Sequence, residues 1–376
     1  MKKIVVYIMR LCLEILYLFM KLFPTEENKV LFLSRQSNEL TQDFMDTQKI
    51  LRDKKPDVKI VTLCHRLEGA EGQGGSGLAS FAATTLKSMY HMATSSVCVL
   101  DAYWPAVSIL HHKKSLTVIQ MWHALGKIKQ SGYQTLGKES GRSADMAYLM
   151  KMHENYDYII AGGKAWNPFY CKSFNTTEDK LINCGLPRID HLLNTAEQNR
   201  SRVFEAYPEF SEKTVVLYAP TFRKNIELHW EKLADRLTAE EGTVLIVKGH
   251  PNQNLHSDNP RVYTCDDFKA VDLLSSCDYL VTDYSAIAIE GAVLSRPTYY
   301  FVYDYEEYRE KNGMNIDLFE EMPGCVFRDA DGLADAIVAG SYNYEALNEY
   351  RKKYLPENLG TSTEQIAKLI TDNMRK

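Results

Sequence analysis

The sequence predicts an α/β protein with two doubly wound, Rossmann-type domains that face a cleft. Three observations support this prediction. At 376 residues the chain is long enough for two domains with sizeable cores. Short β-branched or apolar runs alternate with helical stretches along most of its length. A polar, charged segment near residues 191–212 divides this alternation into two series and predicts the connection between the domains.

The composition is that of an ordinary globular protein, with 45% hydrophobic and 25% charged residues. A disordered or collagen-like chain is therefore excluded. The formal net charge of −5 argues against a strongly basic nucleic-acid binder, and we expect no nucleic-acid partner. The eight cysteines are scattered without a C-x-x-C pair, which argues against a zinc ribbon or a secreted disulfide framework and suits a reducing cytoplasm.

The first element is an amphipathic helix within residues 1–24, whose residues 4–23 form the most apolar stretch of the chain. No small-residue cleavage site follows, so a signal peptide is disfavoured. On a helical wheel the charges fall on one narrow stripe: Lys3, Arg10, Glu14 and Lys21. This pattern favours a helix that lies in the membrane headgroup plane with its charges towards water. A helix buried against the protein's own core and a true membrane span are the alternatives.

The first domain is expected over residues 25–195, with helices such as 41–53 and 78–92 between its strands. Its predicted parallel strands are Val30–Leu33, Val58–Leu63, Val97–Leu100, Thr117–Met121 and Tyr158–Ala161.

The second domain is expected over residues 210–345, followed by C-terminal helices in 346–376. Its predicted strands are Thr214–Ala219, Thr243–Val247, Tyr279–Thr282 and Thr298–Val302. Ligands of doubly wound sheets bind beyond the carboxyl ends of the strands, so the residues after each strand are the candidates for a site.

The first such motif contains Trp122 and His123 after a strand of the first domain. A histidine at this position can act as a general base near neutral pH. The alternative is a histidine that is hydrogen-bonded within a turn.

Two further motifs follow strands of the second domain. One presents the Thr221 hydroxyl and the Arg223 guanidinium, whose planar donors suit phosphate oxygens. The alternative is a solvated loop arginine. The other is Lys248-Gly249-His250, in which glycine allows close approach of a ligand and both cations can bind phosphate. No spacing typical of a metal site occurs, and we expect no metal.

The fourth motif runs from Thr282 through Asp283 to Ser285 and on into a helix. Ser285 is predicted to be the N-cap, so that the backbone N–H groups of Ser285, Ala286 and Ile287 form an anion site. Glu290, one turn further on, could reach ribose hydroxyls. The alternative is a surface-facing helix residue.

Together these motifs resemble the CDP-glycerol glycerophosphotransferase family of wall teichoic acid synthesis, from about residue 118 to 325. The segments similar to the family's motifs are Trp122-His123, Gly185-Leu186-Pro187-Arg188-Ile189-Asp190, Ala219-Pro220-Thr221-Phe222-Arg223, Gly249-His250-Pro251, Thr282-Asp283-Tyr284-Ser285 and Arg296-Pro297. The chain departs from the family at Ala124, where glycine is usual, and at Glu290, where aspartate is frequent. Residues 1–117 carry only weak resemblance.

The resemblance implies a GT-B-like fold and the transfer of glycerol phosphate from CDP-glycerol to a hydroxyl of a lipid-linked undecaprenyl-diphosphate disaccharide, with release of CMP. It implies that Arg223, His250 and the Ser285 helix start hold the diphosphate, that Glu290 holds the ribose, and that His123 deprotonates the acceptor. No cofactor is expected. The catalytic candidates are His123 and His250, and the substrate-binding candidates are Trp122, Arg188, Thr221, Arg223, Lys248, Gly249, Thr282, Asp283, Ser285, Ala286 and Glu290.

The short N-terminal part resembles the primase type, which adds the first glycerol phosphate, and predicts a peripheral enzyme on the cytoplasmic face of the cell membrane. Three alternatives stay open: a transferase that uses CDP-ribitol, a GT-B glycosyltransferase that uses a nucleotide sugar, and a non-catalytic binding protein with a relic site.

Overall fold

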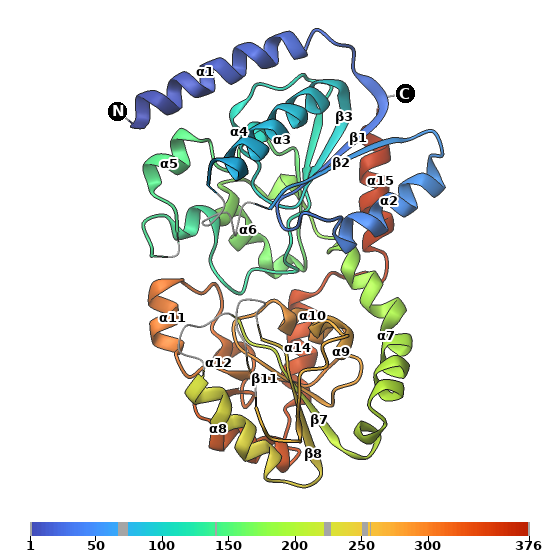
Figure 1. Ribbon diagram of the computed structural model, residues 1–376, viewed down its shortest axis with the longest axis vertical. Helices are drawn as coiled ribbons and strands as arrows, with labels where there is room; N and C mark the ends of the chain where they lie inside the picture. Colours follow the sequence, from blue (N-terminus) through green and yellow to red (C-terminus); the bar gives the residue numbers. More distant parts are fainter. Residues whose placement is uncertain are drawn as a thin grey trace. The chain divides into compact units, whose positions relative to one another are not determined.

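The computed structural model describes residues 2–66, 74–139, 141–221, 227–249, 255 and 257–374. The chain forms two compact units (Figure 1). Unit 1 comprises residues 1–124, 131–190 and 358–376, and unit 2 comprises residues 125–130 and 191–357. The predicted α/β class with two doubly wound domains is confirmed. That the domains face a cleft stays a prediction.

Unit 1 is built on a parallel sheet of six described strands in the order β2-β1-β3-β4-β5-β6. These strands are β1 (Glu26–Ser34), β2 (Lys59–Cys64), β3 (Ser95–Leu100), β4 (Thr117–Gln120), β5 (Tyr158–Ile160) and β6 (Leu181–Ile182). All but β6 were predicted. The two residues of β6 are too few to produce a hydrophobic pattern that sequence inspection can detect.

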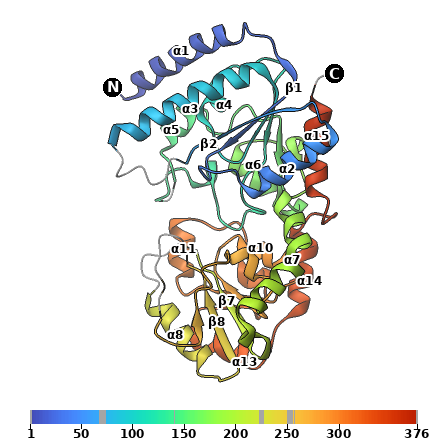
Figure 2. The same ribbon diagram turned by 45° about the vertical axis from the view of Figure 1, so that its right-hand side comes forward.

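Helices cover both faces of this sheet. α3 (Gly74–Thr94) packs on β1, β2 and β3, and α2 (Gln42–Lys54) packs against α15 (Ser362–Asn373), as Figures 1 and 2 show. The shorter helices of the unit are α4 (Pro105–Ile109), α5 (Ala144–Leu149) and α6 (Asn167–Phe174). The internal strand β1, between β2 and β3, is consequently buried from Val30 to Ser34, as expected for a parallel strand with helices on both faces.

α1 (Lys2–Met20) confirms the predicted N-terminal helix and packs against α3 and α5. The expectation that its charged stripe faces water is wrong, because Arg10 and Glu14 contact unit 1 and the apolar side chains point outward. These charges satisfy backbone groups of unit 1 that would otherwise lack partners. Among the described residues, no helix combines the length and the apolarity needed to cross a membrane.

Unit 2 is built on a second parallel sheet, in the order β12-β11-β10-β7-β8-β9. The described strands are β7 (Thr214–Tyr218), β8 (Thr243–Val247), β9 (Val262–Tyr263), β10 (Tyr279–Thr282), β11 (Thr298–Phe301) and β12 (Val326–Phe327). The two-residue strands β9 and β12, at the edges, were not predicted.

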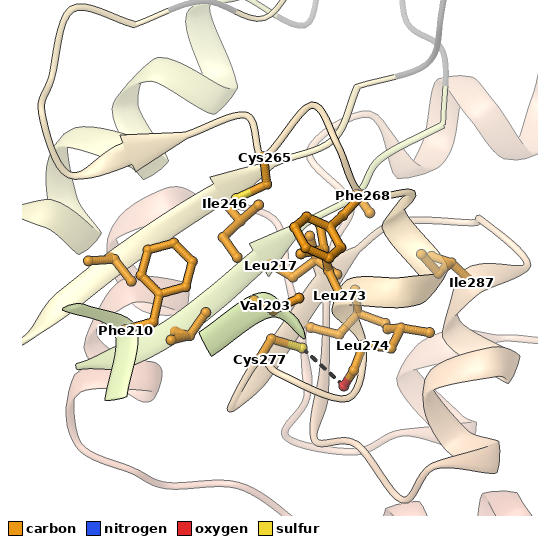
Figure 3. Close-up of a cluster of buried hydrophobic side chains, with 14 residues drawn as sticks. Val203, Phe210, Leu217, Ile246, Cys265, Phe268, Leu273, Leu274, Cys277 and Ile287 are labelled. Carbon is orange, nitrogen blue, oxygen red and sulfur yellow. Dashed lines mark hydrogen bonds between the residues drawn. The ribbon is translucent and has the colours of Figure 1, made fainter. Parts of the chain in front are cut away.

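The core of unit 2 lies between this sheet and helices on its faces. Alternate residues Val215 and Leu217 of β7 meet Val203 of α7 (Pro187–Ala206) and Leu273 of α9 (Ala270–Leu273) in one buried cluster (Figure 3). α8 (Glu227–Thr238) and α13 (Ala330–Val338) pack on each other and contact other strands of the sheet. This two-sided cover explains why the strands of unit 2 have continuous apolar runs.

The boundaries of the units differ from the grouping expected from the sequence. The polar segment near residues 191–212 is largely helical, because it forms most of α7 and a short 3₁₀ helix. The C-terminal helices expected in 346–376 are divided, since α14 (Tyr344–Tyr354) lies in unit 2 and α15 in unit 1. Packing of α15 on α2, which is remote in sequence, determines this division.

Candidate active site

The candidate site of unit 2 lies where its strand order reverses. β7 pairs with β8 on one side and with β10 on the other, so the chain builds outward from β7 in both directions. In doubly wound sheets, ligands bind outside the carboxyl ends of the strands at this reversal. Thr221 follows β7, and Asp283 follows β10. The structure therefore brings two of the predicted segments to the same edge of the sheet.

Asp283 holds the turn that follows β7. Its carboxylate is 3% exposed and accepts hydrogen bonds from the Thr221 backbone N–H at 3.0 and 3.1 Å and from the Thr221 hydroxyl at 2.8 Å. The hydroxyl of Thr282 donates to the Ala219 carbonyl at 2.7 Å. These bonds orient the turn from which the chain continues to Arg223. The predicted contacts of these side chains with substrate stay predictions.

The start of α10 (Ile287–Val293) differs from the prediction. Ala286, not Ser285, is the N-cap, and no side chain caps this helix. The Ser285 carbonyl accepts from the Ala288 N–H at 3.2 Å, because the chain has already turned at this residue. Within the described part of the chain, the N–H groups of Ser285, Ala286 and Ile287 donate to no acceptor. Their predicted role as an anion site stays a prediction.

Glu290 is buried within α10, with 6% of its surface exposed, so the surface-facing alternative is wrong. α10 packs on β10, β11 and α14 and is buried at every position. The close approach depends on Gly291, where a Cβ atom would lie 2.9 Å from Leu280 Cδ2 and 3.1 Å from Thr298 Oγ1. Burial of an acidic side chain is uncommon and typical of a functional or paired group.

Lys248 joins the end of β8 to the segment that follows β9. Its ammonium donates to the carbonyls of Thr264 at 2.9 Å and Cys265 at 3.2 Å. Gly249 is half-buried beside it. The predicted site residues Arg223 and His250 lie outside the described residues.

The strand order of unit 1 reverses between β1 and β3. Asp101 follows β3 directly, and its carboxylate accepts from the Ser34 hydroxyl at 2.6 Å and from the Arg35 backbone N–H at 3.1 Å. Burial raises the pKa of the Asp101 carboxyl to about 6, and these two hydrogen bonds oppose the shift. A buried carboxyl with a raised pKa therefore lies at the reversal point of unit 1.

His123 is held by the backbone carbonyl of the same aspartate. Its Nδ1 lies 2.9 Å from the backbone oxygen of Asp101, which is 22 residues earlier in the chain. This hydrogen bond therefore differs from the alternative, in which the histidine is bonded within a local turn. A carbonyl oxygen can only accept, so Nδ1–H donates and the lone pair of the neutral ring resides on Nε2. Nε2 is therefore the nitrogen that can take up a proton.

Trp122 adopts a left-handed backbone conformation, with φ of 66°. Its N–H donates to the buried Gln120 side chain at 2.9 Å. Its indole packs on the His123 ring at 4.1 Å and meets Phe174 edge-on at 5.0 Å. Strained non-glycine backbone costs about 1–3 kcal/mol and concentrates at functional sites. The indole contacts the ring of His123, whereas contact of Trp122 with substrate stays a prediction.

Arg188 lies in the first turn of α7 and pairs with Asp43 of α2. Its Nε lies 3.0 Å from one Asp43 oxygen and its backbone N–H donates to the other at 2.8 Å, and Nη2 also contacts the carboxylate. Asp43 is buried. The guanidinium thus links α2 to the first turn of α7, and its predicted role in substrate binding stays a prediction.

Two features of these regions were missed by sequence reasoning. Asp101 directly follows a predicted strand, so the rule that selected His123 would also have found it. Asp304 accepts a hydrogen bond from the buried Tyr284 hydroxyl at 3.1 Å. No sequence signal indicates this pair, because its residues are brought together by the packing of β10 against β11.

Two doubly wound α/β units, each with polar residues after its strands, define a GT-B-like fold. The particular family follows from the sequence itself, because residues 15–372 match the profile of CDP-glycerol:poly(glycerophosphate) glycerophosphotransferase. The chain belongs to this family.

Its relatives act in teichoic acid synthesis. The teichoic acid ribitol-phosphate primase of Bacillus spizizenii is 28% identical over 93% of this chain and 92% of that protein. The teichoic acid glycerol-phosphate primase of Bacillus subtilis is 27% identical over 76% of each chain. The solved structure of the wall teichoic acid polymerase TagF superposes with a TM-score of 0.74 at 17% identity, over 99% of this chain and 98% of that chain, and this similarity concerns the fold.

Proposed function

We propose that this protein transfers glycerol phosphate from CDP-glycerol to a hydroxyl of a lipid-linked undecaprenyl-diphosphate disaccharide and releases CMP. Family membership over residues 15–372 supports the reaction class. The observation that carries the proposal is the hydrogen bond from His123 Nδ1 to the Asp101 carbonyl, which assigns the lone pair of the neutral ring to Nε2, the nitrogen that acts as the base.

The proposed reaction is a single displacement at phosphorus. The acceptor oxygen attacks the phosphorus that carries glycerol, and its proton passes to Nε2 of His123. The bond from this phosphorus to the oxygen that bridges the two phosphates breaks, and CMP leaves with the electron pair. Arg223, His250 and the N–H groups at the start of α10 neutralise the diphosphate, and Glu290 binds the ribose. Positioning and charge neutralisation supply most of the catalysis of such transfers.

CDP-ribitol is the second candidate donor. A ribitol-phosphate primase is similar over 93% of this chain, and glycerol-phosphate primases are similar over 76% and 94% of it. Primases that are similar over 76% to 94% of this chain support addition of the first polyol phosphate. We place the reaction on the cytoplasmic side of the membrane, which agrees with the eight free cysteines.

The test is the release of CMP from CDP-glycerol and from CDP-ribitol, each with and without the lipid-linked disaccharide. We expect acceptor-dependent release, with kcat/KM at least tenfold higher for CDP-glycerol. A reversed preference would identify the ribitol enzyme. Absence of CMP from both donors, together with release of UDP from a UDP-sugar, would instead indicate a glycosyltransferase.

A further inference from the structure

Unit 1 contains a pocket of about 180 Å³ at the end of α6, which we call the α6 pocket. Its lining is formed by Tyr133, by residues 152–156 in the loop after α5, by residues 174–176 at the end of α6, and by Lys180. Asn155 and Asn175 are exposed, so the pocket opens to solvent. None of these residues has a part in the proposed reaction as described above.

The backbone around the α6 pocket is strained. Seven non-glycine residues of the described chain have a left-handed conformation, and three of them line the pocket, namely His153 with φ of 64°, Asn155 with 69° and Asn175 with 51°. Backbone strain of this kind concentrates at active sites and ligand clamps. The Asn155 amide donates to three backbone carbonyls at the end of α4, at 2.9 to 3.1 Å, which holds the strained loop in place.

Polar side chains of the α6 pocket have hydrogen-bonding capacity that the fold does not use. The hydroxyls of Tyr133 and Thr176 and the side-chain amide of Asn175 make no hydrogen bond within the described part of the chain. Hydroxyl and amide groups can both donate and accept. The hydroxyl groups of a sugar need partners of this kind, because each of them also donates and accepts.

The charge and the size of the α6 pocket favour an uncharged ligand with a single ring. Among the described residues that line it, Glu154 is the acidic one and Lys180 the basic one, so their formal charges cancel. The Lys180 ammonium also donates to the Tyr156 carbonyl at 2.7 Å. A diphosphate would require an excess of cations. Sites for larger ligands usually have volumes of about 300–1,000 Å³, so a whole nucleotide is too large.

The α6 pocket shares a wall with the predicted base. Phe174 lines the pocket and meets the Trp122 indole edge-on, with ring centroids 5.0 Å apart. His153 also lines the pocket, and its ring centroid lies 5.9 Å from that of Trp122. The indole in turn packs on the ring of His123 at 4.1 Å. A ligand in the pocket would therefore lie close to His123, with the aromatic wall between them.

We propose that the α6 pocket binds one sugar of the acceptor disaccharide and so directs the acceptor hydroxyl to Nε2 of His123. This inference rests on the proposed function, which supplies a saccharide acceptor. The Tyr133 and Thr176 hydroxyls and the Asn175 amide bond to hydroxyls of the sugar. The ring of Tyr133 adds an apolar surface next to these polar groups. The strained loop keeps the pocket in shape before the acceptor arrives, which lowers the entropy that binding costs.

The test uses the double variant Tyr133→Phe, Thr176→Val in the full chain. It removes two hydroxyls with little change of shape. Its matched control is Tyr90→Phe, Thr84→Val, which removes the same two groups from α3, outside the pocket. We expect the KM for the lipid-linked disaccharide to rise at least tenfold in the first variant, because two hydrogen bonds to the sugar are lost, while the KM for the CDP-polyol stays within twofold. The control should keep both values within twofold.

A second measurement needs no turnover. Calorimetric titration with the free disaccharide, cleaved from its lipid diphosphate, measures the affinity of the pocket directly. We expect its Kd to rise at least tenfold in the Tyr133 and Thr176 variant. The thermal transition of this variant should stay within about a degree of that of the wild type, since neither hydroxyl bonds within the described chain.

The two measurements separate this inference from the proposed function. An unchanged acceptor KM in the variant, with acceptor-dependent CMP release by the wild type, would overturn the role of the pocket and leave the proposed function standing. If the wild type releases CMP from neither CDP-glycerol nor CDP-ribitol, the proposed function fails and the titration decides. In that case equal Kd values in variant and wild type, or no binding by the wild type, would overturn the role of the pocket as well.

Discussion

At the residue scale, the candidate site depends on hydrogen bonds between side chains and the backbone of neighbouring strand ends. Asp101 receives bonds from Ser34 and Arg35 through its carboxylate and from His123 through its carbonyl. The Asp283 carboxylate accepts from the backbone N–H and the hydroxyl of Thr221. Each buried carboxylate thereby holds the end of a neighbouring strand in place: Asp101, which follows β3, holds the end of β1, and Asp283, which follows β10, holds the turn after β7.

The first prediction concerns His123 as the base. Replacement His123→Gln should lower kcat by about 10²–10⁴, since Gln cannot accept the proton, while the affinity for the CDP-polyol stays unchanged. Steady-state CMP release and donor binding measure the two quantities. The matched control His91→Gln alters a half-buried histidine of α3 and should keep kcat within about twofold. A large loss of donor affinity in His123→Gln would place this ring on the donor instead.

The second prediction concerns the pH dependence caused by Asp101. Its folded-state pKa of about 6 lies above the ordinary value of 3.8, so the unfolded chain releases this proton first as pH rises. The stabilisation that protonated Asp101 contributes is complete below pH about 4, and it is lost as the pH rises from about 4 to about 6. Asp101→Asn should therefore gain stability relative to wild type across this window, by at most about 3 kcal/mol. Urea unfolding at several pH values measures this difference, and parallel stability curves would contradict it.

At the element scale, a side chain remote in the sequence rather than a local one caps the start of α15. The Asp190 carboxylate accepts from the backbone N–H groups of Ser362 at 3.1 Å and Thr363 at 2.7 Å, and from the Thr363 hydroxyl at 2.7 Å. These residues open α15, more than 170 residues later in the chain. A buried cap of this kind satisfies N–H groups that the helix itself cannot.

The third prediction follows from this cap. Asp190→Ala should lower the free energy of unfolding by about 2–3 kcal/mol, because it leaves buried N–H groups without an acceptor. The control is Asp329→Ala, which removes an exposed local cap whose carboxylate accepts from the Gly332 N–H at 2.8 Å. It should cost about 1 kcal/mol or less. Equal losses in denaturant unfolding would show that burial does not strengthen the cap at Asp190.

At the scale of the whole molecule, α1 is part of unit 1 and not a detachable tether. Its inner side contributes the fully buried Tyr17 to unit 1, and its charged residues bond to backbone groups near His111 and Leu149. The same helix thus stabilises the fold with one side and exposes apolar side chains on the other.

The fourth prediction separates these two roles. Deletion of residues 2–20 should lower the thermal transition of unit 1 by several degrees, because the surface beneath α1 becomes exposed. The Leu11→Asp, Leu18→Asp variant should leave this transition within about a degree of wild type. Calorimetry on both proteins measures the contrast. An unchanged transition after the deletion would mean that α1 contributes nothing to the stability of unit 1.

Individual strands and helix starts show which features can be predicted from the sequence and which cannot. Strands of three or more residues were predicted, whereas β6, β9 and β12 have two residues each and were not. The predicted segments at Thr221 and Asp283 meet, since the carboxyl ends of parallel strands share one edge. The predicted cap at Ser285 was wrong by one residue, because the carbonyl of Ser285 already accepts from Ala288 in the turn that precedes the helix.

By itself the sequence determined the α/β class, the two series of strands, the family and the segments in which site residues occur, since these depend on local hydrophobic periodicity and on short motifs. Only the tertiary structure decided that His123 is oriented by Asp101, that Arg188 pairs with Asp43, that Glu290 is buried and that the charged side of α1 faces the protein. Each of these depends on contacts between residues that are remote in the chain or on the packing of one element on others. Hydrophobic periodicity and motif spacing along the sequence do not reveal such contacts.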